Sequence, residues 1–267
     1  MASPVQDLPE PASGEELVTF EQPLSERIRT FLRIELLYRQ ALFHTQSETD
    51  LGSREAVNSL LGILSILAHG DVRAEALKEL DRLDTLLNRF RQTPEVDTER
   101  LDTIIEGIGK LTSELASYGP HFVGPLKENE FLSAIKHRAW IPGGTCGFDL
   151  PEYGHWLNLP YAERADQLEA WTDYLRPLCN AVNEVLSLLR ETSDPAEHVA
   201  NDGHYIHKLD RRTHYNLIRV MLPAGKGIYP EFSAGKHQFT IRFVEWRGAD
   251  NRPLQVSGVL QFLLALC

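Results

Sequence analysis

The residues that could bind a metal ion are few in this chain. His204, His207 and His214 lie close together, but His207 is followed by Lys208, and Asp210 is the one carboxylate among them. A metal site would need more carboxylate or thiolate support and less positive charge nearby. We therefore expect these histidines to be solvated strand or loop residues, and we predict no metal site.

Cysteine chemistry is also sparse. Cys146, Cys179 and Cys267 show no C-x-x-C spacing, so they support neither a disulfide framework nor a zinc site. Reduced thiols in a cytoplasm are the simpler interpretation. Cys146 precedes His155 by nine positions, which suggests a thiol–imidazole pair, but a buried and inert cysteine is the expected state.

No segment has the pattern of a phosphate-binding loop or of a hydrolase. The Gly-Lys pairs at 225–226 and 235–236 lack the earlier glycine and the Ser or Thr that such a loop requires. The Gly-Gly pair at 143–144 follows a proline, which indicates a tight turn. Neither G-x-S-x-G nor H-E-x-x-H occurs. The sequence therefore predicts a protein that is not an enzyme and that needs no cofactor.

Charge is spread unevenly along the chain. Residues 204–267 hold nine Lys and Arg against four Asp and Glu, a balance of +5, whereas residues 1–203 hold 18 against 34, a balance of −16. An acidic body argues against nucleic-acid binding, because phosphate contacts need a positive face. The basic C-terminal quarter predicts attraction to a local acidic partner.

Basic side chains are the remaining candidates for a binding site. For any single one, a solvated surface charge is the favoured interpretation. The sharper hypothesis is a basic groove between a sheet and helices. Arg33 favours it, because this arginine sits on the narrow polar stripe of an otherwise apolar helix. The other candidates are Arg29 on the same stripe, Lys136 and Arg138 near a helix end, and Arg219, Lys236 and Arg242 in the C-terminal layer.

The apolar spacing predicts helices between residues 23 and 191. The first is expected at 25–44, with Leu36 and Leu42 on a broad apolar face that is typical of a helix central to a core or an interface. The Gly- and Pro-rich segment 141–160 predicts turns or short strands. Further helices are expected at about 53–68, from 71, from 97, at 127–138 and at 163–191.

After residue 203 the apolar residues alternate with polar ones, which is the period of a strand. Strands are expected at 216–222, 237–246 and 254–266, and the short connections fit antiparallel pairing. The predicted fold class is α+β with segregated layers. The expected organisation is a disordered tail at 1–17, a mainly helical domain at 18–200, in which 18–23 adds an edge strand to the sheet, and an antiparallel β domain at 201–267.

Membrane and secretion signals are missing from the sequence. No apolar run reaches the roughly 18–20 residues that span a bilayer. The N-terminal segment is acidic and proline-rich and has no apolar core of a signal peptide. We therefore expect a cytoplasmic protein without membrane contact.

Longer segments match one known family in their order along the chain. They are FEQPLSERIRTFLRIE (20–35), VRAEALKELDR (72–82), IPGGTCGFDLP (141–151), WLNLP (156–160) and YPEFSAGKHQFTIRF (229–243). In these segments the chain resembles the ZapD (YacF) family of Z-ring-associated proteins. The resemblance implies a helical domain with a small antiparallel β domain, and a symmetric homodimer.

The resemblance also implies a function. Members of the family bind the short C-terminal peptide of FtsZ, the division tubulin homologue, and bundle its filaments at midcell, which promotes Z-ring assembly and septation. The alternative is a general dimeric scaffold that binds another acidic peptide. Neither interpretation requires a nucleic acid, a membrane or a cofactor.

The resemblance also implies which residues of this chain form the binding site. The resemblance implies that basic side chains hold the FtsZ peptide, and Arg33 is the second arginine of the R-T-[FW]-L-R-I-E stretch. Arg219, Lys236 and Arg242 occupy matching basic positions in the C-terminal strands, and Arg29, Arg138 and His155 complete the expected set.

Some positions depart from the family pattern. Glu130 occupies a position that is basic in the family. Gly154 occupies the position of a family histidine, and this chain has a histidine one residue later, at His155. Gln238 occupies a position at which relatives carry arginine. If these positions contact the peptide, the side chains that line the peptide pocket of this chain differ from those of its relatives.

Overall fold

The computed structural model describes residues 16–91, 97–191, 193–210, 212–235 and 237–267. The tail predicted at 1–17 therefore lies, as far as residue 15, outside the described residues. Contacts divide the chain into two compact units. The helical unit is Thr30–Ser187, and the sheet unit combines Met1–Arg29 with Leu188–Cys267.

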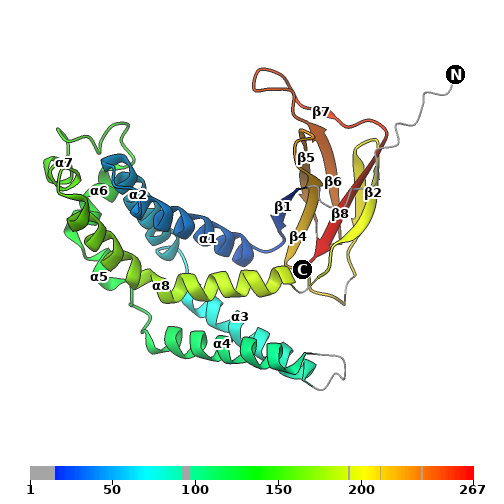
Figure 1. Cartoon of the computed structure of the whole chain (residues 1–267), viewed down its shortest axis with the longest axis horizontal. Helices are drawn as coiled ribbons and strands as arrows, with labels where there is room; N and C mark the ends of the chain where they lie inside the picture. Colours follow the sequence, from blue (N-terminus) through cyan, green and yellow to red (C-terminus); the bar gives the residue numbers. More distant parts are fainter. Residues whose placement is uncertain (1–15, 92–96, 192, 211, 236) are drawn as a thin grey trace. The chain divides into compact units, whose positions relative to one another are not determined.

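The predicted helices are present with small shifts at their ends. Helix α7 lies in the segment where turns or short strands were expected. None of the described helices is long and apolar enough to cross a membrane. The helices are α1 (Glu26–Thr45), α2 (Asp50–Leu67), α3 (Val72–Phe90), α4 (Thr98–Ser117), α5 (Gly124–Lys127), α6 (Glu130–Arg138), α7 (Pro151–Leu157) and α8 (Tyr161–Glu191) (Figure 1).

Short polar side chains begin four of these helices. The oxygen of Thr49 accepts a hydrogen bond from the Gly52 amide at the start of α2. Asp71, Asp97 and Asn129 accept in the same way at α3, α4 and α6. Each cap satisfies an amide that has no partner within its own helix, so the sequence itself sets where these helices start.

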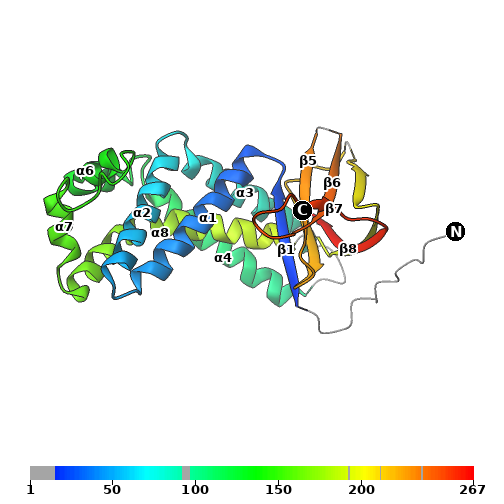
Figure 2. The same ribbon diagram turned by 90° about the horizontal axis from the view of Figure 1, so that it is seen from above.

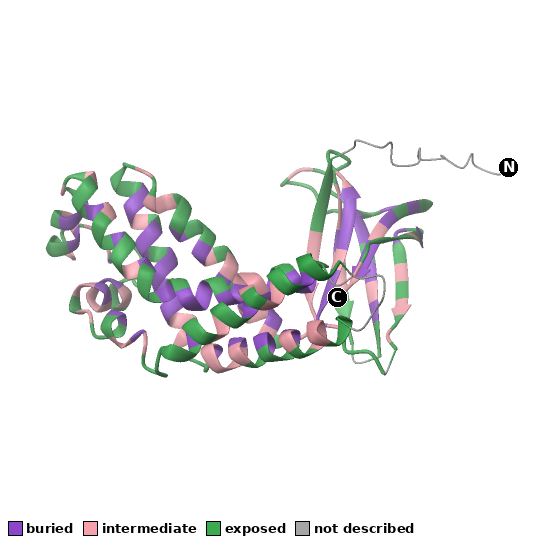
Figure 3. Cartoon of the chain, turned by 60° about the horizontal axis from the view of Figure 1, so that its bottom comes forward, coloured by how far each residue is buried: buried purple, intermediate pink, exposed green. Residues whose placement is uncertain are grey.

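The core of the helical unit is shared by α1, α2 and α8, which run alongside one another (Figures 1 and 2). Figure 3 shows the buried residues as a stripe along each of these helices. Leu36 and Leu42 of α1, on the face expected in a core or an interface, are 45% and 38% exposed and therefore do not enter the core of this chain. The buried stripe of α1 follows the three- and four-residue spacing of a single helix face, namely Ile28, Phe31, Ile34, Tyr38 and Ala41.

The sheet unit is an antiparallel sheet in the order β1-β4-β8-β2-β3-β6-β5, with β7 paired to β6. The expected strand at 18–23 is β1. The strand expected at 254–266 is two strands, separated at Gly258, whose φ is +79°. Strands β2, β3 and β5 were not predicted. The strands are β1 (Leu17–Pro23), β2 (Ala196–Asn201), β3 (His204–Lys208), β4 (Leu217–Pro223), β5 (Ile228–Ala234), β6 (Gln238–Glu245), β7 (Leu254–Gln255) and β8 (Val259–Leu266).

The predicted alternation of β6 is confirmed as far as Phe243, but Val244, which was expected on the polar face, is buried. Phe239, Ile241 and Phe243 are fully buried, whereas Arg242 is exposed on the opposite face. The turn between β2 and β3 is Asp202-Gly203, and both residues have a positive φ. A Cβ atom at Gly203 would lie 2.6 Å from the Val256 carbonyl oxygen, so no other residue fits this hairpin without displacement.

A charge network joins β1, β4 and the last turn of α8 inside the sheet unit. Arg190 donates to both carboxylate oxygens of Glu21, at 2.8 and 2.9 Å, and Nε of Arg219 lies 3.2 Å from the same carboxylate. The Arg219 contact is an ion pair without hydrogen-bond geometry, since its Nε has no hydrogen-bond partner. Arg219 also donates to the Arg190 carbonyl oxygen at 3.0 Å. All three side chains are only 19–24% exposed.

Three polar rings form a cluster on β2 and β3. The Tyr205 hydroxyl lies 2.9 Å from Nδ1 of His198 and 3.1 Å from Nδ1 of His207, and the His207 ring stacks on Phe239. The expectation of a solvated His207 was therefore wrong, whereas His204 and His214 are exposed. Within the described residues, no group of three or more His, Cys, Asp or Glu is arranged to hold a metal ion.

The charge network generates a stability prediction. Glu21→Gln is expected to lower the free energy of unfolding by about 1–3 kcal/mol, because it leaves two mostly buried guanidinium groups facing a neutral amide. Thermal or denaturant unfolding measures the change. Glu231→Gln, which removes the exposed partner of Arg242, is the matched control and should cost less than about 1 kcal/mol. Equal losses in the two variants would contradict the assignment.

The ring cluster generates a pH prediction. Burial, and to a smaller extent the charge of His198, lower the pKa of His207 from its usual value of 6.5. Because the folded state favours the neutral ring, its contribution is complete above pH 6.5 and is lost as the pH falls through the lower folded-state pKa. His207→Gln should therefore flatten the fall in melting temperature between pH 7.5 and 5. The exposed His214→Gln should leave that fall as it is, and identical profiles for both variants would refute the prediction.

Candidate functional site

A groove of about 470 Å³ lies in the helical unit between α1, α2 and the end of α6. Most of its wall is apolar, and two cations, Arg33 from α1 and Lys136 from α6, stand in it. Its lining residues are Arg33, Leu36, Leu37, Asn58, Leu61, Gly62, Ser65, Ile66, Lys136, Ala139 and Trp140.

The folding of α1 places its contribution to the groove. Leu36 and Leu37 follow Arg33 by three and four residues, so the three side chains share one side of the helix. This side is turned away from the buried stripe that contains Phe31 and Ile34. Leu36 and Leu37 therefore form part of the groove wall beside the positive charge of Arg33.

Gly62 of α2 shapes the floor. A Cβ atom at this position would lie 3.2 Å from each terminal methyl carbon of Leu37, which is tighter than ordinary van der Waals contact. The missing side chain lets Leu37 approach the backbone of α2 closely. A Cβ atom at position 62 would require the end of the Leu37 side chain to move by a few tenths of an ångström.

A second hollow of about 250 Å³ adjoins the first and shares Leu61 and Lys136 with it. It adds one cationic position, Lys127, together with His137 and further aliphatic wall. Lys127 reaches the Leu67 carbonyl oxygen at the end of α2, at 3.5 Å. We call the two hollows together the α2–α6 groove. The residues particular to the second hollow are Leu64, Ala68, Leu126, Lys127, Leu132, Ser133 and His137.

The charge of the α2–α6 groove is one-sided. Its described lining residues include Arg33, Lys127, Lys136 and His137 but no Asp or Glu. The whole chain, by contrast, carries a net charge of −11. Cations above an aliphatic floor suit a ligand with carboxylates and apolar side chains.

The predicted site residues fall into separate places. Among the described candidates, Arg33 and Lys136 line the α2–α6 groove. Nε of Arg29 lies 3.2 Å from Glu26, Arg138 lies 3.9 Å from Asp149, and Arg242 donates from Nε to Glu231 at 2.9 Å. Arg219 belongs to the Glu21 network of the sheet unit. Lys236 lies outside the described residues.

His155 lines a different hollow of the helical unit, of about 380 Å³. Its wall includes stacked rings of Phe131, Trp156 and Trp171, and the indole Nε1 of Trp156 donates to Gln167 at 2.6 Å. These rings pack on one another and on the buried Tyr153, which indicates a structural cluster. His155 and Arg33 therefore line different hollows.

The departures from the family pattern have local explanations. Glu130 is exposed in the first turn of α6, where the helix dipole stabilises a carboxylate. A Cβ atom at Gly154 would lie 3.1 Å from the Cα atom of Gly147, so the close approach of two backbones favours glycine there. Neither residue is part of the α2–α6 groove wall.

The cysteines show no sign of chemistry. Cys179 is fully buried, and burial raises the pKa of its thiol, which keeps it protonated and inert. Cys146 is half-buried rather than buried as expected.

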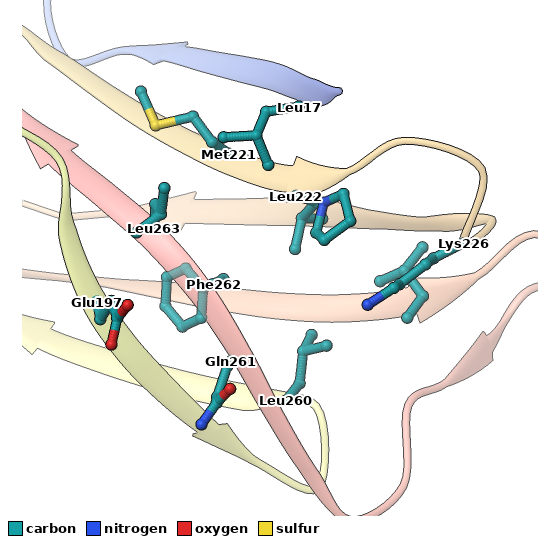
Figure 4. A pocket seen from close by; sticks show the side chains of 11 residues that line it. Leu17, Glu197, Met221, Leu222, Lys226, Leu260, Gln261, Phe262 and Leu263 are labelled. Atoms are coloured by element: carbon teal, nitrogen blue, oxygen red, sulfur yellow. The ribbon is translucent and has the colours of Figure 1, made fainter. Parts of the chain in front are cut away.

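The sheet unit contains a smaller hollow of about 40 Å³ (Figure 4). Leu222, Leu260 and Phe262 provide apolar wall, and Figure 4 shows Lys226 and Glu197 on either side of them. This hollow is less than a tenth of the size of the first, and its one cation is accompanied by a carboxylate. It is the poorer candidate for an acidic ligand.

Sequence reasoning missed Trp140 and Lys127. A tryptophan between a basic helix end and an Ile-Pro-Gly-Gly turn was the available signal for Trp140. Nothing local distinguishes Lys127 from other surface lysines, because its role depends on the approach of α5 to the end of α2.

Known proteins identify the family of this chain. The ZapD family model, described as a cell division protein, matches residues 32–242. The chain is 33% identical over 251 residues to the "Cell division protein ZapD" of Coxiella burnetii, covering 94% of this chain and 97% of that protein. For the proteins of the same name from Ralstonia nicotianae and Escherichia coli, the identities are 36% and 35%, with 94% of this chain and 99% and 98% of the relatives covered. These names describe a role in cell division and no enzymatic activity. The chain belongs to the ZapD family of cell division proteins.

Proposed function

We propose that this chain binds the acidic and apolar C-terminal peptide of FtsZ in the α2–α6 groove and thereby cross-links FtsZ filaments at the Z-ring. The observation that carries the proposal is a groove without carboxylates on a chain whose net charge is −11. Membership of a cell division family supports it. Basic side chains above an aliphatic floor are complementary to a tail with carboxylates and apolar residues.

Peptide docking here needs little rearrangement of the protein. Much of the groove wall comes from α2 and α6, whose starts are capped, so these parts of the protein lose little freedom when a peptide binds. The flexible FtsZ tail loses much more, because ordering a disordered segment opposes binding. Each site is therefore expected to be weak and salt-dependent.

Bundling follows from repetition of a weak site. In a homodimer, which is part of this proposal, the twofold axis presents two copies of the groove. Two tails from different filaments then join through one dimer, and many such links along the filaments reinforce one another. The process requires no catalysis, no nucleic acid and no membrane, and it places the protein in the cytoplasm at midcell. Contributions from Arg29, Arg138, Arg219, Lys236, Arg242 and His155 to peptide binding stay predictions.

The first test is co-sedimentation with FtsZ filaments. Full-length FtsZ should pellet with the protein and form bundles, and FtsZ without its C-terminal peptide should do neither. Raising the salt from 50 to 300 mM should weaken co-sedimentation, because the exposed cations of the groove are screened. Bundling of tail-less FtsZ would contradict the proposal. Equal affinity for a scrambled tail peptide would point to the alternative, a general scaffold for acidic peptides.

The second test reverses charges in the groove. Lys136→Glu and Arg33→Glu should each weaken binding of a fluorescent FtsZ tail peptide by about tenfold, because each places a carboxylate beside the ligand's own. Lys110→Glu, on the exposed face of α4, makes the same charge change outside the groove and should alter affinity less than about twofold. Analytical ultracentrifugation should show the same oligomer in all variants. Unchanged affinity in well-folded Arg33→Glu and Lys136→Glu proteins would remove the groove from the site.

A further inference from the structure

The segment between α6 and α7, residues 139–150, is built from successive turns. The Ile141 amide donates to the Arg138 carbonyl oxygen at 3.0 Å, and the Gly144 amide donates to that of Ile141 at 2.8 Å. The amides of Cys146 and Leu150 donate within the segment as well, each at 2.9 Å. The backbone is thereby hydrogen-bonded along its length, in contrast to an open surface loop.

Arg54 of α2 fastens this segment to the helical unit. Its Nη1 donates to the carbonyl oxygen of Thr145 at 3.0 Å and lies 3.2 Å from the Thr145 hydroxyl. The same guanidinium lies over the ring of the buried Tyr153, 4.9 Å from its centroid. A Cβ atom at Gly144 would lie 2.6 Å from the Arg138 carbonyl oxygen, so the turn leaves no space for another residue there.

This fastened segment carries two very exposed aromatic side chains. Trp140 is 85% exposed and Phe148 is 82% exposed. Trp140 lines the α2–α6 groove, and Phe148 is not among the lining residues. An aromatic ring held outside the core by an ordered backbone is typical of a binding anchor, because little freedom is lost when a partner covers it.

We infer that Trp140 is the residue that determines which acidic peptides the groove accepts, by covering a large apolar side chain of the ligand. This inference rests on the proposed function of the groove. Lys136 and Trp140 line the same hollow, at the end of α6 and just beyond it. The preferred ligand therefore carries a large apolar side chain close to the carboxylate that meets Lys136.

The test compares two aromatic-to-alanine changes on one segment. Trp140→Ala should weaken binding of the FtsZ tail peptide by about tenfold or more, whereas Phe148→Ala should change it by less than about twofold. Trp140→Phe should restore most of the affinity. Because both side chains are exposed, neither change should lower the melting temperature measurably, and this control separates lost binding from lost folding.

Peptide variants complete a double-mutant cycle. Replacing the ligand's large apolar residue with Ser, with its carboxylates kept, should weaken binding to the original protein but have little further effect on Trp140→Ala. Additive losses would overturn the inference, and so would equal affinities of Trp140→Ala and Phe148→Ala. If the original protein fails to bind the peptide at all, the proposed function itself fails, so the two outcomes are distinguishable.

Discussion

Burial of one stripe of α1 determines which of its side chains remain available for binding. Ile28, Phe31 and Ile34 enter the interior, and the close contact of Leu37 with Gly62 sets how near α2 can come. With that stripe occupied, Arg33 and Leu36 have to stand in the wall of the groove. The hydrophobic core thus positions a cation, and the energy that holds the cation in place comes from side chains that never touch a ligand.

The chain uses its arginines in two contrasting ways. In the sheet unit, Arg190 and Arg219 share the carboxylate of Glu21 and are mostly buried, and this contact joins two strands to a helix end. In the α2–α6 groove, Arg33 stands in a wall without any Asp or Glu among its described residues. The same residue type therefore joins strands to a helix end in one unit and lines a mostly apolar hollow in the other.

Much of the helical architecture could be read from the sequence, because long amphipathic helices carry a strong periodic signal and short polar caps mark their starts. The strands were harder. β5 contains Pro230 and follows a glycine-rich turn, and β2 is mostly exposed, so neither shows a clean alternation. Arg33 was found from the pattern of its own helix. Lys136 was a candidate by charge alone. Lys136 and Trp140 line the groove only because α6 packs beside α1 and α2, and no local sequence pattern predicts that packing. Arg219 and Arg242 were chosen for charge, but the carboxylates of Glu21 and Glu231 that pair with them come from other strands.

The strand order of the sheet has a consequence for how the chain is made. β1, near the start of the sequence, pairs with β4, and β4 pairs with β8, whose last residue is Leu266. Closing so long a loop is slow. On a ribosome, residues 30–187 emerge as a complete helical unit while β1 still lacks its neighbour. The sheet can be completed only once β8 has left the exit tunnel, so a chain that lacks β8 would keep its helices and leave β2 and β4 with unpaired edges that invite aggregation.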